Sequence, residues 1–199
     1  MQGTLYQINV GSGGIPKHPI ASATVTLERV LGDDQTHHMS KPRVKPTDFR
    51  GHGGADKAVC LFSFEVLEEL VHEGVAVFPG ALGENFTTQG LDYRLIRVGD
   101  LYQIGDKVMI QITEPREPCA TIRDRYTPAP QRSIGAMIYN KAVKEGKFLD
   151  HMWGRSGFYA RVRRTGSVQT GDAIHQLEFP DPLGLLVPPR DFLPESQKH

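Results

Sequence analysis

The chain has 199 residues, and its 23 Lys and Arg residues balance 23 Asp and Glu residues, so the formal net charge is zero. This balance argues against nucleic acid or anionic membranes as default partners, because both are held by an excess of cations. No apolar run approaches bilayer length, and the start, MQGTLYQINV, lacks the basic and apolar segments of a secretion signal. We therefore expect a cytoplasmic protein with one domain over residues 1–179 and a proline-rich tail over residues 180–199.

The N-terminal part predicts two strands and a long loop. Residues 5–10 alternate, with Tyr6, Ile8 and Val10 on one face, and residues 23–30 are rich in β-branched side chains. Residues 31–54 are polar and basic without periodicity. This segment is too long to be an idle connection in a compact domain, so we expect it to have a function.

The middle of the chain predicts a buried strand followed by a helix. Residues 58–63, AVCLFS, form a short apolar run typical of a strand buried on both faces, with Cys60 in the core. Ser63 is a good N-cap for a helix over residues 64–74, whose apolar side chains recur at helical spacing and which stops at Gly74.

The second half again predicts strands. Glycine-aspartate pairs at 99–100 and 105–106 mark turns between segments in which apolar and polar residues alternate. A short helix is expected around residues 134–144. Residues 157–179 predict a hairpin in which Tyr159 faces away from Phe158 and the core. With 21 glycines and 14 prolines spread along the chain, this pattern indicates a mainly β, barrel-like fold with a few short helices, α+β overall.

The stretch EPREPCATI follows a predicted strand, and its two prolines bracket an Arg-Glu pair directly before a cysteine. Pro115 should end the strand, and Pro118 should hold the next residues in a stiff extended turn, which presents Cys119. The plain alternative is a buried thiol that behaves as a small hydrophobe. A disulfide with Cys60 is not expected in a reducing compartment.

The reactivity of Cys119 depends on neighbouring charges. Arginines such as Arg116 and Arg123 would lower the pKa of the thiol, whereas Glu114 and Glu117 would oppose that effect. The sequence leaves the sign of the shift open.

The stretch GHGGADKAV is a candidate anion site. Consecutive glycines, Gly53 and Gly54, let backbone amides converge on an anion, and His52 and Lys57 would add positive charge. Asp56 could accept from amides in the turn or orient His52. The alternative is a plain loop that enters the next strand.

The stretch GALGENFTTQGL places Glu84 beside Asn85 between glycines. A carboxylate and an amide together suit a hydrogen-bonding heterocycle. Turn formation explains the asparagine almost as well.

Two other kinds of site are less favoured. A Cys-His-Asp hydrolase triad could consist of Cys119, His52 and Asp56, but a chain with eight histidines permits many such combinations. Zinc could be held by Cys119 with His37, His38 and His52, yet no zinc-binding spacing is present.

Taken in order, five motifs resemble the MOSC family, named for the C-terminal domain of molybdenum cofactor sulfurase. The resemblance extends over about residues 5–174, and the chain most resembles the stand-alone bacterial YiiM-like branch of the family. The motifs are GDDQ, HGGADKAV, GENFTTQGL, VGDLYQIGDKVMIQITEPREPC and GFYARVRRTGSVQTGDAI.

The resemblance implies a barrel-like domain that binds the molybdenum cofactor, a molybdopterin. Cys119 would be the catalytic residue and the protein ligand of molybdenum, since a soft thiolate suits a soft metal centre. The cofactor's phosphate would be held by arginines and the glycine turn, and its pterin edge or the substrate by Glu84 and Asn85. The implied cofactor-binding residues are His52, Gly53, Gly54, Asp56, Lys57, Glu84, Asn85, Arg116 and Arg123.

These features favour an enzyme, a molybdenum-cofactor-dependent oxidoreductase that reduces N-hydroxylated small molecules with an electron-donor reductase as partner. The alternative is a sulfur carrier or cofactor-binding module that forms a persulfide on Cys119 without redox turnover. Cysteine desulfuration by this chain alone is not expected, because it lacks the aminotransferase-like domain of the sulfurase. The chain also departs from the branch in the insert KPRVKPTDFR and in its proline-rich tail.

Overall fold

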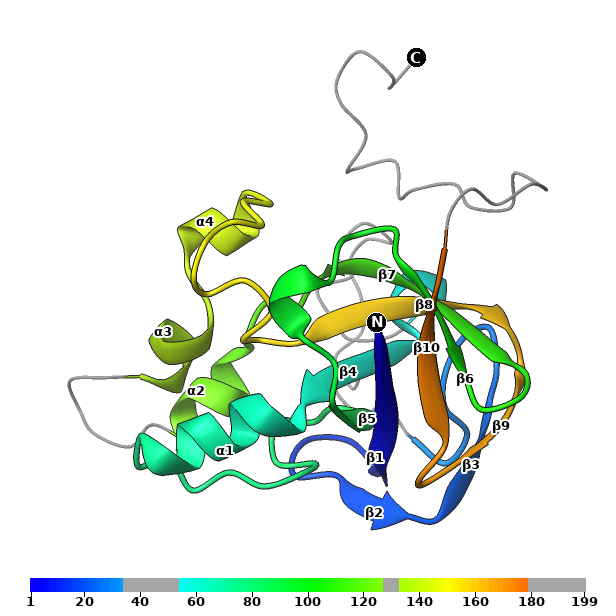
Figure 1. Cartoon of the computed structure of the whole chain (residues 1–199). Coiled ribbons are helices and arrows are strands. Elements are labelled where there is room, and N and C mark those ends of the chain that lie inside the picture. The colour runs from blue at the N-terminus through cyan, green and yellow to red at the C-terminus, as the bar shows by residue number, and fades with distance from the viewer. Residues whose placement is uncertain (34–53, 127–132, 179–199) are drawn as a thin grey trace, which may run out of the picture.

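A computed structural model describes residues 1–33, 54–126 and 133–178. They form a β-barrel with helices gathered on one side (Figure 1). The strands are β1 (Gln2–Val10), β2 (His18–Ile20), β3 (Ser22–Val25), β4 (Val59–Ser63), β5 (Phe86–Gln89), β6 (Leu101–Ile104), β7 (Val108–Pro115), β8 (Phe158–Arg164), β9 (Gly166–Gln169) and β10 (Ala173–Leu177). The helices are α1 (Phe64–His72), α2 (Ala120–Tyr126), α3 (Ile134–Ile138) and α4 (Lys141–Lys144), with 3-10 turns η2 (Ala55–Lys57) and η3 (Tyr93–Leu95).

The barrel closes because β1 pairs with both β5 and β10. The strand order is β10-β6-β7-β8-β4-β5-β1, and β2 pairs with residues 8–10 at the end of β1. The pairs are antiparallel except β4 with β5, which is parallel. Strands β3 and β9 form a separate two-stranded ribbon. Closure satisfies the backbone hydrogen bonds of every barrel strand and leaves each wall with an inner and an outer face.

Strand β4 contributes to two hydrophobic cores. Val59 and Leu61 point into the barrel, whereas Phe62 packs in a second cluster with Leu67 and Leu70 of α1. All residues of β4 are buried. The outer face of the barrel wall is therefore covered by the helices, and polar groups placed there are shielded from water.

Several elements agree with the sequence. The buried strand is β4, and the helix after it is α1, whose N-cap Ser63 accepts from the Val66 backbone N–H at 3.3 Å. Strands β6 and β7 form the hairpin expected around the second glycine-aspartate turn. Pro115 ends β7. The mainly β, barrel-like fold with short helices is confirmed.

Other predictions were wrong in detail. The first strand does not keep Tyr6 and Ile8 on one face, because the register shifts between Leu5 and Gln7 and leaves Tyr6 39% exposed. Strand β3 stops at Val25, since the Thr26 N–H donates to the Arg29 carbonyl and turns the chain.

The C-terminal half also differs from the prediction. The helix expected over residues 134–144 is broken into α3 and α4 by extended backbone at Tyr139 and Asn140. The hairpin expected over residues 157–179 does not form, because β9 pairs with β3, and β10 pairs with β6 and β1. Helix α2 was not predicted.

Some predictions fall outside the described residues. They concern most of the loop over residues 31–54, including His37, His38, His52 and Gly53, and the tail over residues 180–199. Within the parts that the structure describes, no helix has the length and apolarity to span a membrane.

Gly157 is a packing constraint at the start of β8. Its φ is +78°, and an added Cβ would lie 2.2 Å from the Leu61 carbonyl oxygen of β4. We expect Gly157→Ala to lower the free energy of unfolding by about 3 kcal/mol or more, measured by urea denaturation. Gly171→Ala is the control, because Gly171 has φ +94° with nothing within 4 Å, so only the left-handed backbone cost of about 1–2 kcal/mol applies. Equal losses in both variants would contradict the predicted clash.

Candidate functional site

The site lies on the wall where β4, β7 and β8 meet. Cys60 of β4 is the cross-strand partner of Tyr159 of β8, and Tyr159 also pairs with Glu114 of β7. Arg116 directly follows β7, and its backbone N–H donates to the Gly157 carbonyl at 2.9 Å. Sheet pairing thus brings together segments that are distant in the sequence.

Arg116 is a buried cation at the centre of this wall. The residue is 3% exposed, and its Nη2 donates to the Leu82 carbonyl oxygen. Its Nε is buried and has no hydrogen-bond partner. Buried polar groups are normally satisfied, so an unpaired N–H of this kind marks a place for an external acceptor.

Among the described residues, no carboxylate forms an ion pair with Arg116. The ion pairs found between described residues involve other cations, such as Lys57 and Arg161. Burial raises the pKa of Cys60 and Tyr159, which favours their neutral forms. Burial by itself lowers the pKa of Arg116, but attraction to the anionic forms of its neighbours outweighs that effect, and the guanidinium stays charged.

Four ionisable groups interact electrostatically with Arg116. Together with it they form what we call the Arg116 cluster, namely Cys60, Glu84, Cys119 and Tyr159. Within this cluster, Cys119 alone is half-exposed, whereas its other members are buried. An external molecule would therefore meet the charge of Arg116 at Cys119.

Cys119 lies between the second proline of the loop and α2. Its side chain is half-buried and packs against the second hydrophobic cluster, and its carbonyl accepts from the Arg123 N–H at 3.3 Å. The expectation of a thiol that is presented and not packed is thus correct only in part. Cys119 thus keeps partial exposure, in contrast to Cys60, which is 5% exposed and lies in the core as predicted.

Glu84 is fully buried and belongs to the turn before β5. Its Oε1 accepts from the Gly80 N–H at 2.6 Å and from Thr87 Oγ1 at 3.0 Å, while Oε2 has no partner. Burial raises the pKa of this carboxyl. One oxygen therefore maintains the turn, and the other is the atom left for the predicted contact with a ligand.

Asn85 is also fully buried, and both of its polar atoms are used inside the protein. Its Oδ1 accepts from the Cys60 N–H at 3.0 Å, and its Nδ2 donates to Asp33 Oδ2 at 2.8 Å. The Asp33 carboxylate also accepts from the Gly11 N–H at 2.9 Å and from Lys17 Nζ at 2.7 Å. Through these bonds Asn85 holds β4 and the loop after β1 in place.

Two described residues of the HGGADKAV motif, Asp56 and Lys57, form ion pairs with side chains of the barrel strands. Lys57 Nζ lies 2.5 Å from Glu114 Oε1 and 5.0 Å from the centre of the Tyr159 ring. Asp56 Oδ1 lies 2.8 Å from Arg161 Nη2. Lys57 therefore reaches the Arg116 cluster through Tyr159, whereas Asp56 is tied to an ion pair and is two-thirds exposed.

Gly54 and Arg123 take different positions at the edge of the site. Gly54 has φ +89° and open space where a Cβ would be. Arg123 is exposed on α2, and its aliphatic part packs over Gly135 of α3. The structure thus brings Arg116, Cys119, Glu84 and Lys57 to one wall and leaves Arg123 on the adjoining helix surface.

Sequence reasoning missed Tyr159, Cys60 and Asp33 as site residues. Alternation placed Tyr159 on the face opposite the core, but its burial depends on helices and loops that cover that face. Asp33 stands in the GDDQ motif, and only the folded chain shows that it binds Asn85. Among the described residues, no group of three or more metal-ligating side chains is found.

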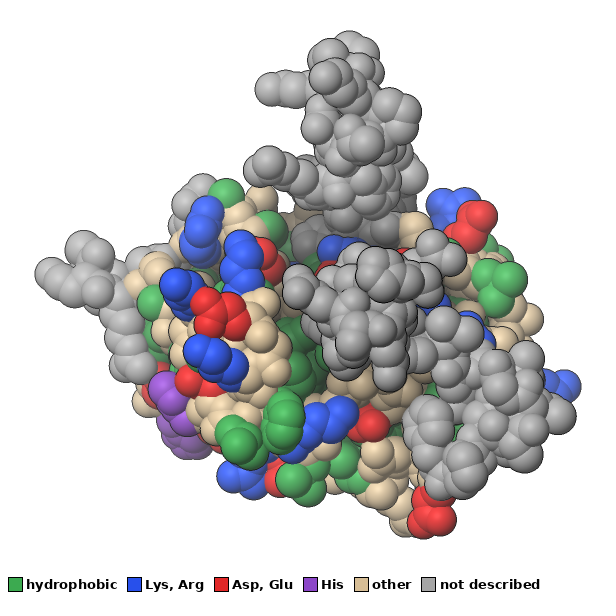
Figure 2. Space-filling view, turned by 90° about the horizontal axis from the view of Figure 1, so that it is seen from above, with side chains coloured by type: hydrophobic (Ala, Val, Ile, Leu, Met, Phe, Trp, Pro, Cys, Tyr) green, Lys and Arg blue, Asp and Glu red, His purple; other side chains and the backbone are tan. Residues whose placement is uncertain are grey.

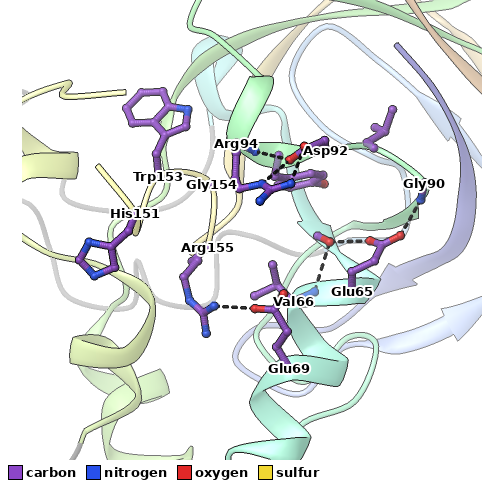
Figure 3. A pocket seen from close by; sticks show the side chains of 13 residues that line it. Glu65, Val66, Glu69, Gly90, Asp92, Arg94, His151, Trp153, Gly154 and Arg155 are labelled. Carbon is purple, nitrogen blue, oxygen red and sulfur yellow. Dashed lines mark hydrogen bonds and ion pairs between the residues drawn. The ribbon is translucent and has the colours of Figure 1, made fainter. Parts of the chain in front are cut away.

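A separate cleft of about 520 Å³ lies beside α1, away from the Arg116 cluster (Figure 3). Trp153 and Tyr93 are buried in its lining. Its charged groups pair with each other, as in Arg155 Nη1 with Glu69 Oε2 at 2.5 Å. Charges of both signs also alternate on the face seen in Figure 2. Two acidic side chains of the cleft, Asp92 and Glu69, thus pair with its two arginines, Arg94 and Arg155.

The raised pKa of Glu84 predicts a pH dependence of stability. The folded protein holds the proton more tightly than the unfolded chain, so this contribution is present below the ordinary pKa of 4.5 and is lost as pH rises through the folded value. We expect the stability of wild type relative to Glu84→Gln to fall over a pH series that rises from about 4 upward, measured by urea denaturation. Glu68→Gln, at an exposed position of α1, controls for the loss of one negative charge. A constant difference between wild type and Glu84→Gln across this range would contradict the prediction.

Comparison with known proteins agrees with this architecture. The MOSC domain profile matches residues 48–175. The protein YflK of Bacillus subtilis is 30% identical over 168 residues, which cover 82% of this chain and 63% of YflK. A protein named Reductase from Gibberella moniliformis is 30% identical over 157 residues, which cover 77% of this chain and 23% of that protein. This chain therefore spans less than two thirds of the length of both relatives.

A solved structure shows the same fold. The crystal structure of YiiM from Geobacillus stearothermophilus superposes with a TM-score of 0.58 and 24% identity, covering 92% of this chain and 78% of that one. The profile match extends over more than half of the sequence, and its last residues lie in β10, which closes the barrel. The chain belongs to the MOSC domain family and resembles its YiiM-like members.

Proposed function

We propose that this protein binds the molybdenum cofactor with Cys119 as the metal ligand and reduces N-hydroxylated small molecules. MOSC domains are associated with this cofactor in general, and one relative carries the name Reductase. The observation that carries the proposal is the half-buried Cys119, which interacts electrostatically with Arg116, whose charge and unpaired Nε are buried in the wall.

The residues present suit such a cofactor. A thiolate is a soft ligand that molybdenum accepts, and Cys119 is the accessible thiol of the described chain. The unpaired N–H of Arg116 would donate to an anionic oxygen of the cofactor, and Glu84 Oε2 would accept from a donor group of the pterin. Gly54 leaves open space at the edge of the site. These features fit a ligand that combines a metal, an anion and a hydrogen-bonding ring.

The protein groups would bind and orient, and the bound metal would supply the electron transfer. In the overall reaction, an N–OH group and two protons become N–H and water, with two electrons from an external electron-donor protein. Arg116 would hold the anionic part of the bound group and keep it close to the wall. The half-buried position of Cys119 against the second hydrophobic cluster would limit the access of water to its sulfur.

Replacement of Cys119 tests the proposal. Protein from a host that makes the cofactor should contain molybdenum and release a fluorescent pterin, whereas Cys119→Ser should lose about tenfold or more of both, because a hydroxyl is a poorer ligand. Cys60→Ala is the matched control, since Cys60 is buried in β4 and should not affect the metal content. Wild-type protein that lacks molybdenum, under conditions that load a YiiM protein, would refute the proposal.

A second candidate function is sulfur transfer without redox turnover. The same cation would stabilise an anionic persulfide on Cys119, formed when a donor persulfide gives its outer sulfur to the thiolate and leaves as a thiolate. Incubation with a persulfide donor should then add the mass of one sulfur atom to the peptide that contains Cys119. A stable adduct together with no turnover of N-hydroxylated substrates would favour the carrier over the reductase.

A further inference from the structure

An apolar patch is exposed on the segment after α4 and on η3. Helix α4 and this segment project from the side of the barrel (Figure 1). Leu149 is 86% exposed, and Phe148 and Leu95 are about half exposed. Folded monomers seldom leave several large apolar side chains together in water, so such a patch marks an interaction surface.

Arg97 joins the two parts of this patch. Its guanidinium carbon lies 4.4 Å from the centre of the Phe148 ring, and its Nη1 donates to the Ile96 carbonyl at 3.0 Å. Trp153 Nε1 donates to the same carbonyl at 2.8 Å and ties the segment after α4 to η3. Leu95 of η3 and Phe148 therefore belong to one surface, with a cation between them.

Lysines form the rim of the patch. Lys141, Lys144 and Lys147 are exposed, and one carboxylate, Glu145, is shared by Lys141 at 3.6 Å and Lys147 at 2.9 Å. The side chain of Asp150 accepts two hydrogen bonds from its own segment, so it is directed inward. Positive charge is therefore in excess around the patch.

We call the patch and its rim the α4 surface. It consists of Leu95, Arg97, Lys141, Lys144, Lys147, Phe148 and Leu149.

The α4 surface adjoins the loop that carries Cys119. Lys144 Nζ lies 3.4 Å from Glu117 Oε1, and Glu117 stands two residues before Cys119. Tyr139, which lies between α3 and α4, packs against the same hydrophobic cluster as Cys119. A protein docked on the α4 surface would therefore lie beside this loop.

We infer that the α4 surface docks an acidic electron-carrier protein, which supplies electrons to the site at Cys119. The inference rests on the proposed function, because reduction of an N–OH group to N–H and water takes two electrons from outside the chain. Two encounters with a carrier that gives up one electron each time supply them, and the carrier leaves oxidised.

The composition of the α4 surface suits this partner. An apolar centre with a charged rim is the usual anatomy of a protein interface. The excess of lysine favours an acidic partner, since complementary charge speeds encounter and selects the partner. The patch is small, and electron-transfer complexes are among the smallest and weakest specific interfaces, which lets the carrier leave after each transfer.

Titration with flavodoxin, an acidic one-electron carrier, tests the docking directly. The full chain without cofactor is added to isotope-labelled flavodoxin, and the shifts of the flavodoxin NMR signals give the dissociation constant, Kd. We expect binding at low salt that weakens as salt is added, because exposed charges are screened over about 10 Å at 0.1 M salt.

Two variants separate the lysine rim from the apolar centre. We expect Lys147→Glu and Leu149→Ser each to raise Kd by about fivefold, since the first reverses a rim charge and the second removes apolar contact. Lys147→Glu should also weaken the salt dependence, whereas Leu149→Ser should leave it unchanged.

Matched controls carry the same changes outside the α4 surface. Lys107 is exposed at the turn between β6 and β7, at the opposite end of β6 from η3. Leu27 is exposed in the turn after β3, which lies on the other side of the barrel from α4 (Figure 1). Lys107→Glu and Leu27→Ser should keep the wild-type Kd.

The outcomes differ from those of the molybdenum experiment. Absence of binding by wild type at low salt would overturn the docking, and a wild-type Kd in both Lys147→Glu and Leu149→Ser would overturn its assignment to the α4 surface. A chain that contains molybdenum but does not bind flavodoxin keeps the proposed function and loses this inference. A chain that binds flavodoxin through this surface but contains no molybdenum does the reverse.

Discussion

A charge buried in a protein wall must be neutralised or hydrogen-bonded, and Arg116 meets this requirement only in part. Its guanidinium donates to the Leu82 carbonyl, yet Nε lacks a partner and no carboxylate of the described chain forms an ion pair with it. The half-buried Cys119 belongs to the groups that interact electrostatically with this cation. The chemistry proposed for the site follows from this incomplete compensation.

The closed barrel makes such a site possible. Because β4 packs on both faces, the outer surface of its wall is covered by α1 and the segments after β7, and polar groups there are withdrawn from water. The hydrogen bonds of Asn85 with Cys60 and Asp33 then fix β4 against the loop after β1. The loop that carries Cys119 lies outside this network and keeps partial exposure.

Local elements were predictable where one physical signal dominated. The apolar run of β4, the Ser63 cap of α1 and the proline that ends β7 were read from sequence and are confirmed. Errors arose where a long-range contact decided the outcome. Residues 157–179 alternate like a hairpin, yet β10 gains more by closing the barrel against β1 and β6.

The sequence alone determined that Cys119 follows two prolines in a loop after a strand, three residues beyond Arg116. Only the tertiary structure decided that Arg116 is buried and donates to the Leu82 carbonyl, that Asn85 bonds to Cys60 and Asp33, and that Cys60 pairs with Tyr159 across the sheet. The reason is that hydrogen bonding and desolvation depend on which groups surround an atom. Such surroundings come from strand pairing between distant segments, which residue types and spacing do not specify.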